Sequence, residues 1–246
     1  LPQSGYYVLR SPECDSYLIF DCGPIGPRHS PGHGHADTLS FELAAYGQTL
    51  VIDPGVYEYM ESEWRYYFRS TVAHNTVTVD DQDQSVFWAS FLVAEMARAR
   101  LIRWETNDVY DEVEGEHDGY TRFKNPVVHR RHIRHVKPDR WIVTDTLESD
   151  GRRAHRYDLW FHLTPAQCSI DENTNACRVH FPSNVILDIL PEHPTGSLVD
   201  VQNGWISCAW KQKIAAPVVH YALTSSAPVT VFKTTLVVSQ QSRTES

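Results

Sequence analysis

Short runs of β-branched and aromatic residues recur along almost the whole chain, and clusters of Gly, Pro, Asn or Asp separate them. This alternation is typical of β-strands joined by turns. Only residues 37–45 resemble the start of a helix. The sequence therefore predicts an antiparallel all-β fold, with strands over residues 6–10, 17–20, 50–52, 76–79, 94–104, 127–135, 141–147, 155–163, 176–181, 185–190, 205–210, 218–223 and 229–238.

The length of 246 residues permits one large β domain or two small ones. Turn clusters are regularly spaced and no linker or internal repeat interrupts them, which favours one large two-layer β-sandwich over residues 1–246. The clearest hairpin is expected over residues 130–146, with its turn at residues 137–140. Pro138 suits the second position of such a turn.

The charge balance argues against nucleic acid as a partner. The chain has 22 Lys and Arg against 31 Asp and Glu, a net charge of −9, and no basic run that would track phosphates. A protein with a net negative charge also binds an anionic polymer poorly unless basic side chains cluster in one region. The sequence offers one such group, whose arginines could form a positive groove: Arg65, Arg69, Arg98, Arg100, Arg103, Arg130, Arg131 and Arg134.

Two further classes of feature are absent from the sequence. No stretch reaches the roughly 18 apolar residues of a membrane-spanning helix. The five cysteines form no Cys-x-x-Cys pair, so a cysteine-based zinc site is disfavoured. Cys14 with Cys22, or Cys168 with Cys177, could each close a hairpin in an oxidising compartment.

The sequence leaves open whether two copies form a homodimer.

Three separate segments each bring a metal-binding side chain into a strand-forming context. His33 and His35 would point the same way on a strand, with Cα atoms about 7 Å apart. One imidazole could then hold a metal while the other faces a substrate. Asp53 and His74 would complete three protein ligands with His35, the number at which zinc keeps a position open.

The same segments carry a resemblance to a known family. They are GHGHADTLSF (32–41), IDPGVY (52–57), YFRST (67–71), AHNT (73–76) and DDQDQS (80–85). In this order they resemble the β-sheet domain of the heparinase II/III-like polysaccharide lyases, densely over residues 5–90. The resemblance implies a supersandwich-like fold preceded by a helical toroid. Since the chain opens Leu-Pro-Gln without Met or a signal sequence, we expect it to be a piece of a longer enzyme.

The resemblance also assigns roles within the site. His33 corresponds to the histidine of the family that faces the substrate, and His35, Asp53 and His74 correspond to ligands of a zinc ion that holds the site together. The main catalytic tyrosine would lie on the helical toroid, with the β domain contributing a histidine and sometimes a tyrosine. The expected substrate is an anionic, uronate-containing polysaccharide, and the expected location is periplasmic or extracellular.

Cleavage of such a polymer by β-elimination removes the proton at C5, neutralises the C6 carboxylate and protonates the departing O4 oxygen. We select Tyr67 and Arg69 beside His33 for this work, because a guanidinium grips a carboxylate through two bonds. The spacing does not distinguish Tyr67 from the other tyrosines between the ligands, which are Tyr57, Tyr59 and Tyr66. An internal salt bridge is the rival role for Arg69.

Each residue of the site also has a simpler interpretation. His33 could be a loop histidine held by its flanking glycines, and Asp53 a turn carboxylate before Pro-Gly. His74 could be a buried histidine bonded to the backbone, and Asn75 could orient it. We expect His162, among aromatic neighbours, to be structural. His129, His132 and His135 cannot share one strand face, which argues against a second metal site there.

Two alternatives come from other protein classes. A cupin-type metalloenzyme also pairs His-x-His with a carboxylate, but here Glu42 lies seven positions after His35 and the second cupin motif is missing. A non-catalytic carbohydrate-binding or scaffolding domain would not explain the His, Asp and His set. Heparan sulfate, alginate and bacterial exopolysaccharide all remain compatible substrates. The few basic residues favour a carboxylated polymer over a densely sulfated one.

Overall fold

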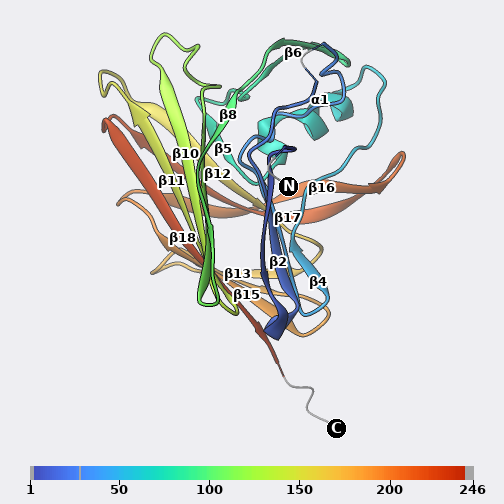
Figure 1. The fold of residues 1–246 in the computed structure, drawn as a ribbon, viewed down its shortest axis with the longest axis vertical. Coiled ribbons are helices and arrows are strands. Elements are labelled where there is room, and N and C mark those ends of the chain that lie inside the picture. The colour runs from blue at the N-terminus through green and yellow to red at the C-terminus, as the bar shows by residue number, and fades with distance from the viewer. Residues whose placement is uncertain (1–2, 28, 242–246) are drawn as a thin grey trace.

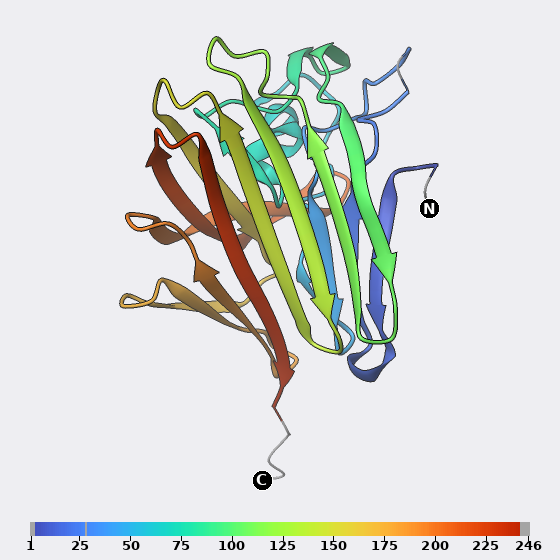
Figure 2. The ribbon, with the colours of Figure 1, turned by 60° about the vertical axis from the view of Figure 1, so that its left-hand side comes forward.

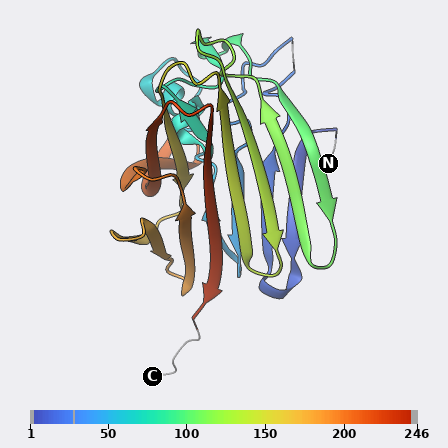
Figure 3. The same cartoon turned by 90° about the vertical axis from the view of Figure 1, so that its left-hand side faces the viewer.

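The computed structural model describes residues 3–27 and 29–241 and confirms the antiparallel two-layer β-sandwich (Figure 1). One layer, which faces the viewer in Figure 3, is an eight-stranded sheet with the order β13 (Gln167–Asp171), β14 (Ala176–His180), β15 (Val185–Glu192), β18 (Val229–Gln240), β11 (Arg140–Ser149), β10 (Val127–Val136), β9 (Tyr110–His117) and β8 (Ala99–Thr106).

The other layer consists of two four-stranded sheets (Figures 1 and 2). The two sheets meet where the ends of β4 and β12 lie side by side, and there the amide of Ile52 bonds to the carbonyl of His162 at 2.9 Å. The strands of this layer are β1 (Tyr6–Ser11), β2 (Ser16–Asp21), β3 (Phe41–Ala45) and β4 (Gln48–Val51), then β16 (Leu198–Ala209), β17 (Gln212–Ser225), β12 (His155–His162) and β5 (Val77–Val79).

Smaller elements gather at one end of the sandwich, at the top in Figure 1. They are the helix α1 (Glu63–Arg69), a 3-10 turn at Thr71–Ala73 and a hairpin of β6 (Val86–Ala89) and β7 (Leu92–Glu95). Another 3-10 turn, Pro12–Cys14, joins β1 to β2. None of the described helices is long and apolar enough to cross a membrane.

The hairpin of β10 and β11 shows why this sequence forms a sandwich. Buried and partly exposed residues alternate strictly along β10, which is the period of a strand with one face on the core. Val136 pairs with Arg140, so the expected turn at Pro138 is confirmed. Ile133 from β10 and Val143 from β11 enter a core that also receives side chains from both four-stranded sheets.

Several expectations were wrong. Residues 37–45 do not begin a helix, because Phe41–Ala45 is a strand with hardly any exposed residue and therefore shows no alternation. The helix α1 was missed, since its seven residues are rich in aromatics and too few to show a period. Within the described residues the sheets end at edge strands and do not close into a barrel, which excludes the cupin alternative.

The cysteines and the central arginines also differ from expectation. All five cysteines are free thiols in the structure, so neither of the two pairings that the sequence left open is a disulfide there. The positive groove does not form, because strand register sets most of these arginines beside carboxylates. Arg100 and Arg130 both contact Glu116, at 2.6 and 3.2 Å, and Arg103 contacts Glu112 at 2.6 Å. Arg65 and Arg69 are buried in the fold.

A buried ion pair ties the large sheet to the loops at the end of the sandwich. Arg131 of β10 bonds to both carboxylate oxygens of Asp145 on β11, at 2.7 and 3.1 Å, and both residues are inaccessible to solvent. The Arg131 guanidinium also donates to the carbonyls of Leu39, at 2.8 Å, and Asn75. His129 adds a bond of 2.7 Å to Asp145.

This network predicts an acid-sensitive contribution to stability. Burial alone raises the pKa of Asp145, but the Arg131 charge and the His129 bond outweigh it and lower the pKa from 3.8 to about 2. A carboxylate with a lowered folded-state pKa stabilises the fold above its unfolded pKa, and that contribution disappears as the pH falls from about 4 to about 2. The difference corresponds to about 2 kcal/mol.

Asp145→Asn should therefore lower the free energy of unfolding by about 2 kcal/mol or more at pH 7, and the gap to the wild type should narrow below pH 4. Urea unfolding at several pH values measures this. Asp108→Asn, at an exposed loop position, is the matched control and should change stability by less than about 0.5 kcal/mol. A gap that stays constant down to pH 2 would contradict the assignment.

Candidate functional site

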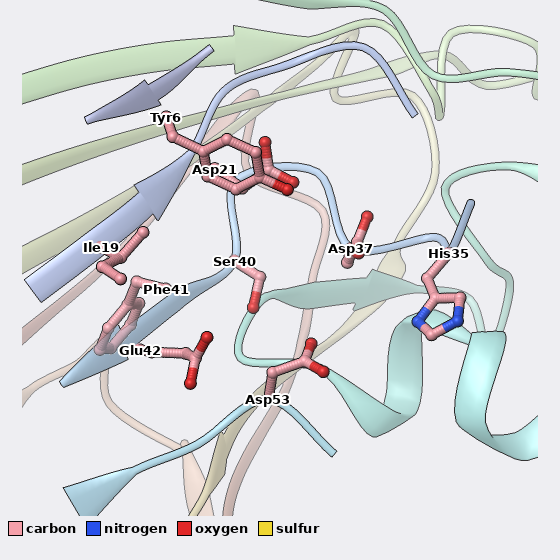
Figure 4. Close-up of a pocket in the computed structure, with 9 residues that line it drawn as sticks. All are labelled: Tyr6, Ile19, Asp21, His35, Asp37, Ser40, Phe41, Glu42 and Asp53. Carbon is pink, nitrogen blue, oxygen red and sulfur yellow. The ribbon is translucent and has the colours of Figure 1, made fainter. Parts of the chain in front are cut away.

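Segments far apart in the sequence converge at the loop end of the sandwich. His33, His35 and Asp37 lie in the connection between β2 and β3, and not on a strand as expected. Asp53 follows β4, and His74 follows the 3-10 turn Thr71–Ala73. Figure 4 shows the His35, Asp37 and Asp53 side chains around one cavity.

The three residues expected to be ligands meet at the His74 ring. His74 Nε2 lies 3.3 Å from His35 Nδ1 and 3.4 Å from an Asp53 carboxylate oxygen. Ligand atoms at the corners of a tetrahedral zinc site with bonds of about 2.0–2.1 Å are separated by about 3.3–3.4 Å. The His74 Nδ1 proton is donated to the Ser70 carbonyl at 2.7 Å, so the Nε2 lone pair faces the other two groups.

Asp53 serves both of the roles that the sequence allowed. One carboxylate oxygen accepts a bond of 2.8 Å from the amide of Gly55, as a turn carboxylate does. The other faces His74. The bond from Gly55 therefore holds the Asp53 carboxylate in place and leaves its second oxygen available for a metal.

Asp37 is a further potential ligand that the sequence reasoning missed. Donor atoms of His35, Asp37 and His74 all lie within 4.8 Å of one another. The sequence feature that could have pointed to Asp37 is its position two residues after His35. Burial, with the charges of Asp21 and Asp53, holds the pKa of Asp37 well above its usual range.

The cavity in front of these residues is strongly acidic. It has a volume of about 290 Å³, and four carboxylates line it, those of Asp21, Asp37, Glu42 and Asp53. Burial raises the pKa of Asp21 to about 6, against the bond from Gly23 and with the help of Asp53. No Lys or Arg of the described residues forms an ion pair with any of the four. Two imidazoles and these carboxylates are thus a donor set that fits a divalent cation.

His33 lies on the solvent-exposed side of the His35, Asp53 and His74 cluster. It is exposed, whereas His35 is buried, and it lines a neighbouring cavity of about 300 Å³ together with His35 and Asp37. Its imidazole packs edge-on against two aromatic rings, Tyr59 at 5.0 Å and Phe91 at 5.6 Å between centroids. The division into a buried and an outward histidine matches the expected pair.

The glycines on either side of His33 are required by close packing. A Cβ atom on Gly34 would lie 2.2 Å from the carbonyl oxygen of Ile25, and one on Gly32 would lie 2.9 Å from that of Phe91. No side chain fits at such distances. The Gly-His-Gly sequence therefore lets the loop press against two backbone segments while the imidazole projects outward.

Tyr67 and Arg69 are not brought to the open face of His33. The Tyr67 hydroxyl accepts a bond of 3.1 Å from the amide of Trp205, and the cavity that Tyr67 lines shares no residue with the two cavities around His35. Arg69 is fully buried and donates to the carbonyls of Gly34, at 3.1 Å, and Ser90, at 2.7 Å. This geometry favours a structural role for Arg69. Of the four tyrosines considered, Tyr59 is the one whose ring contacts His33.

Asn75 and His162 link the segments that carry the three expected ligands. The Asn75 side chain donates to the carbonyls of Phe41 and Ile52, both at 2.9 Å, and accepts from the amide of His162 at 2.6 Å. These bonds join the ends of β3, β4 and β12 next to His74. His162 is buried and its Nε2 contacts the Val72 carbonyl at 2.9 Å, as expected of a structural histidine.

Comparison with known proteins identifies the family. The sequence profile described as Heparinase II/III-like, C-terminal, matches residues 1–236. The chain belongs to this family. A heparin-sulfate lyase of Bacteroides thetaiotaomicron is 25% identical to this heparinase-like chain over 195 residues, 74% of the chain and 25% of the relative. An alginate lyase of Stenotrophomonas maltophilia is 30% identical over 146 residues, 54% of the chain and 19% of the relative.

Solved structures agree on the fold. The crystal structure of a heparan sulfate lyase from Pedobacter heparinus matches this heparinase-like domain with a TM-score of 0.81 at 18% identity, covering 97% of the chain and 36% of that structure. The chain thus spans only 19 to 36% of the length of these three proteins. The domain described here corresponds to one part of longer enzymes.

Proposed function

We propose that this chain is the β-sandwich domain of a polysaccharide lyase that cleaves uronic-acid-containing glycans by β-elimination. The observation that carries the proposal is the convergence of His35, Asp53 and His74 on one point, with His33 exposed beside them. The family's named lyases of heparin sulfate and alginate, which are polymers with carboxylated sugars, support the same reaction class.

His33 is the residue proposed to meet the substrate. Its exposed imidazole can accept or return a proton, or bind the C6 carboxylate of a uronate that enters the adjoining cavity. The contacts with Tyr59 and Phe91 hold the ring at the mouth of this cavity. No nucleophile is needed, because β-elimination proceeds by proton transfers.

We further propose zinc as the cation held by His35 Nδ1, His74 Nε2 and Asp53, with the Asp37 carboxylate next to them. Imidazole nitrogens and a carboxylate oxygen are ligands that zinc commonly takes. When bound, the ion would supply positive charge that offsets the acidic cavity and holds the three loops together. The reaction with the carbohydrate would take place at the exposed His33 and not at the ion.

Tyr59 replaces Tyr67 as the proposed assisting tyrosine. Its ring contacts the His33 imidazole, with centroids 5.0 Å apart. Burial raises the pKa of Tyr67, whose hydroxyl is engaged with the Trp205 amide. A phenol in the position of Tyr59 is suited to protonate the departing O4 oxygen.

The rest of the active site is proposed to come from a helical domain of the same longer protein, working outside the cytoplasm where polymeric glycans are met. The relatives named above are roughly three to five times longer than the part that this chain matches. A second candidate, glycan binding without cleavage, is favoured by exposed aromatic rings near His33. Phe91 and Trp210 are both about half exposed, and Trp210 packs 5.2 Å from Tyr59.

A protein that contains this domain with its helical partner is expected to release unsaturated oligosaccharides from a uronate polymer, detected by their far-ultraviolet absorbance. His33→Ala should reduce kcat by about 10²–10⁴-fold, the range for lost proton transfer, with an unchanged unfolding curve. His132→Ala, on the outer face of β10, is the control. New reducing ends without the ultraviolet signal would instead indicate a hydrolase.

The two tyrosines are expected to differ in a side-by-side test. Tyr59→Phe should lower kcat by about 10²-fold or more, because it removes the proton donor but keeps the ring. Tyr67→Phe should change kcat less than about threefold and reduce stability by about 1 kcal/mol through loss of the bond from Trp205. Steady-state kinetics and urea unfolding of both variants show which tyrosine assists the reaction. The opposite ranking in kcat would return the role to Tyr67.

Metal analysis of the purified chain is expected to find about one zinc ion per molecule. His35→Ala and His74→Ala should each release it, and Asp37→Asn should weaken its retention against a chelator. His132→Ala should leave the zinc content unchanged. Chelation should also lower the unfolding temperature of the wild type, since a ligand of the folded state stabilises it. An absence of zinc from the wild-type protein would refute this part of the proposal.

A further inference from the structure

Two arginines on one face of α1 are buried without a carboxylate partner. Arg65 and Arg69 are four residues apart, so their side chains leave the helix on the same side. Their exposed fractions are 1% and 0%, and no acidic side chain of the described residues lies within 4.0 Å of either guanidinium. The nearest acidic influence is Glu61, which acts on Arg69 and binds Ser90. A buried charge without a counter-ion in contact is costly for folding, so the pair calls for an explanation.

Both guanidiniums bind backbone carbonyls of the loop that carries His33. Arg65 Nη2 donates to the carbonyl of Gly32 at 3.0 Å, and Arg69 Nε donates to that of Gly34 at 3.1 Å. These are the residues immediately before and after His33. The two arginines therefore grip the peptide on both sides of the imidazole.

The same arginines attach the loop to the hairpin of β6 and β7. The Ser90 carbonyl, in the turn of this hairpin, accepts from Arg65 Nη2 at 3.0 Å and from Arg69 Nη1 at 2.7 Å. Phe91, the next residue of the turn, places its ring against His33. One shared acceptor thus fixes the distance between the hairpin and the His33 loop.

Arg65 also lies behind both rings that contact the imidazole. Its Cζ atom is 5.1 Å from the centroid of Tyr59 and 5.7 Å from that of Phe91. Cations at such distances are attracted to aromatic rings, more strongly when shielded from water. Arg65 therefore contacts both of the rings that pack against His33, and these two rings also contact each other, with centroids 6.1 Å apart.

We propose that Arg65 and Arg69 are positioning residues that fix the direction of the His33 side chain. Each uses the planar fork of a guanidinium to hold two backbone segments at once, which the single ammonium group of lysine cannot reproduce. The kinetic consequence rests on the function proposed for His33, whereas the structural consequence does not. A misplacement of about 1 Å is enough to cost about 10²-fold in rate at a proton-transfer site.

The test compares Arg65→Lys and Arg69→Lys with Arg122→Lys in the chain described here. Arg122 is a close control, because it also donates to carbonyls, among them Gln84 at 3.0 Å, and its Cζ atom lies 4.8 Å from the Phe123 ring. Its hydrogen bonds go to the carbonyls of Asp83, Gln84 and Gly119, and its ion pair goes to Glu95 at 3.8 Å, so none of these contacts involves the His33 loop. Nuclear Overhauser contacts between the His33 imidazole and the Tyr59 ring are the first measurement.

We expect these contacts to be lost or strongly weakened in Arg65→Lys and Arg69→Lys and to persist in Arg122→Lys. In the longer enzyme the first two variants should lower kcat by about 10-fold to 100-fold with KM changed less than about threefold. Loss of the contacts in this chain, combined with no lyase activity in the wild-type longer protein, would support the positioning role and refute the proposed function. Unchanged contacts in both variants, or equal loss in Arg122→Lys, would overturn the positioning role.

A folding defect does not prevent the test. If either lysine variant is too unstable for spectroscopy, Arg65→Gln and Arg69→Gln are used, because they remove the buried charge and its desolvation cost. The same loss of the contact between His33 and Tyr59 is expected from them. A glutamine variant that retains the full contact would overturn the proposal.

Discussion

The site depends on the buried contact between Arg131 and Asp145, although neither residue belongs to a motif that marks the site. Arg131 reaches from the large sheet to the carbonyl of Leu39, in the loop of His35, and to that of Asn75, the neighbour of His74. Asp145 holds the guanidinium in place through two bonds. Removing either partner would leave an uncompensated buried charge between the layers. The two histidines proposed as ligands are therefore set at their separation by the packing of the whole sandwich.

Opposite charges flank the proposed metal ligands. The acidic cavity lies on one side, where the Asp21 charge, burial and further carboxylates raise the pKa of Tyr6 to about 12. The guanidiniums of α1 bind the loop that carries His33 and act electrostatically on His35. Burial, His74, Arg65 and Arg69 together hold the pKa of His35 well below its usual range, so its ring stays neutral. A neutral imidazole that lines a carboxylate-rich cavity has a lone pair available for a cation, and the carboxylates favour a cation there.

Sequence patterns predicted the parts of this molecule that depend on local order. The alternation in Val127–Val136 predicted a strand, and the spaced motifs predicted which histidines and which aspartate meet. What failed depends on direction in space. The sequence gives no sign that the Tyr59 ring turns toward His33 while Tyr67 turns toward Trp205, because both lie in short aromatic segments without periodicity. The prediction of an arginine-lined groove was wrong because the register of the strands pairs Arg100 and Arg130 with Glu116. That register cannot be read from the sequence.

The charge distribution bears on how much of a lyase site this domain can hold. β-Elimination needs the substrate carboxylate to be neutralised, yet Arg100, Arg103 and Arg130 of the large sheet are paired with glutamates. Arg65 and Arg69 bind backbone carbonyls. With a net charge of −9, the domain offers few free cations to an anionic polymer. On the proposed function, neutralisation must come from the bound cation, from His33 in its charged form or from the rest of a longer protein. The domain's own share is then to hold one imidazole and one phenol at fixed positions beside an open cavity.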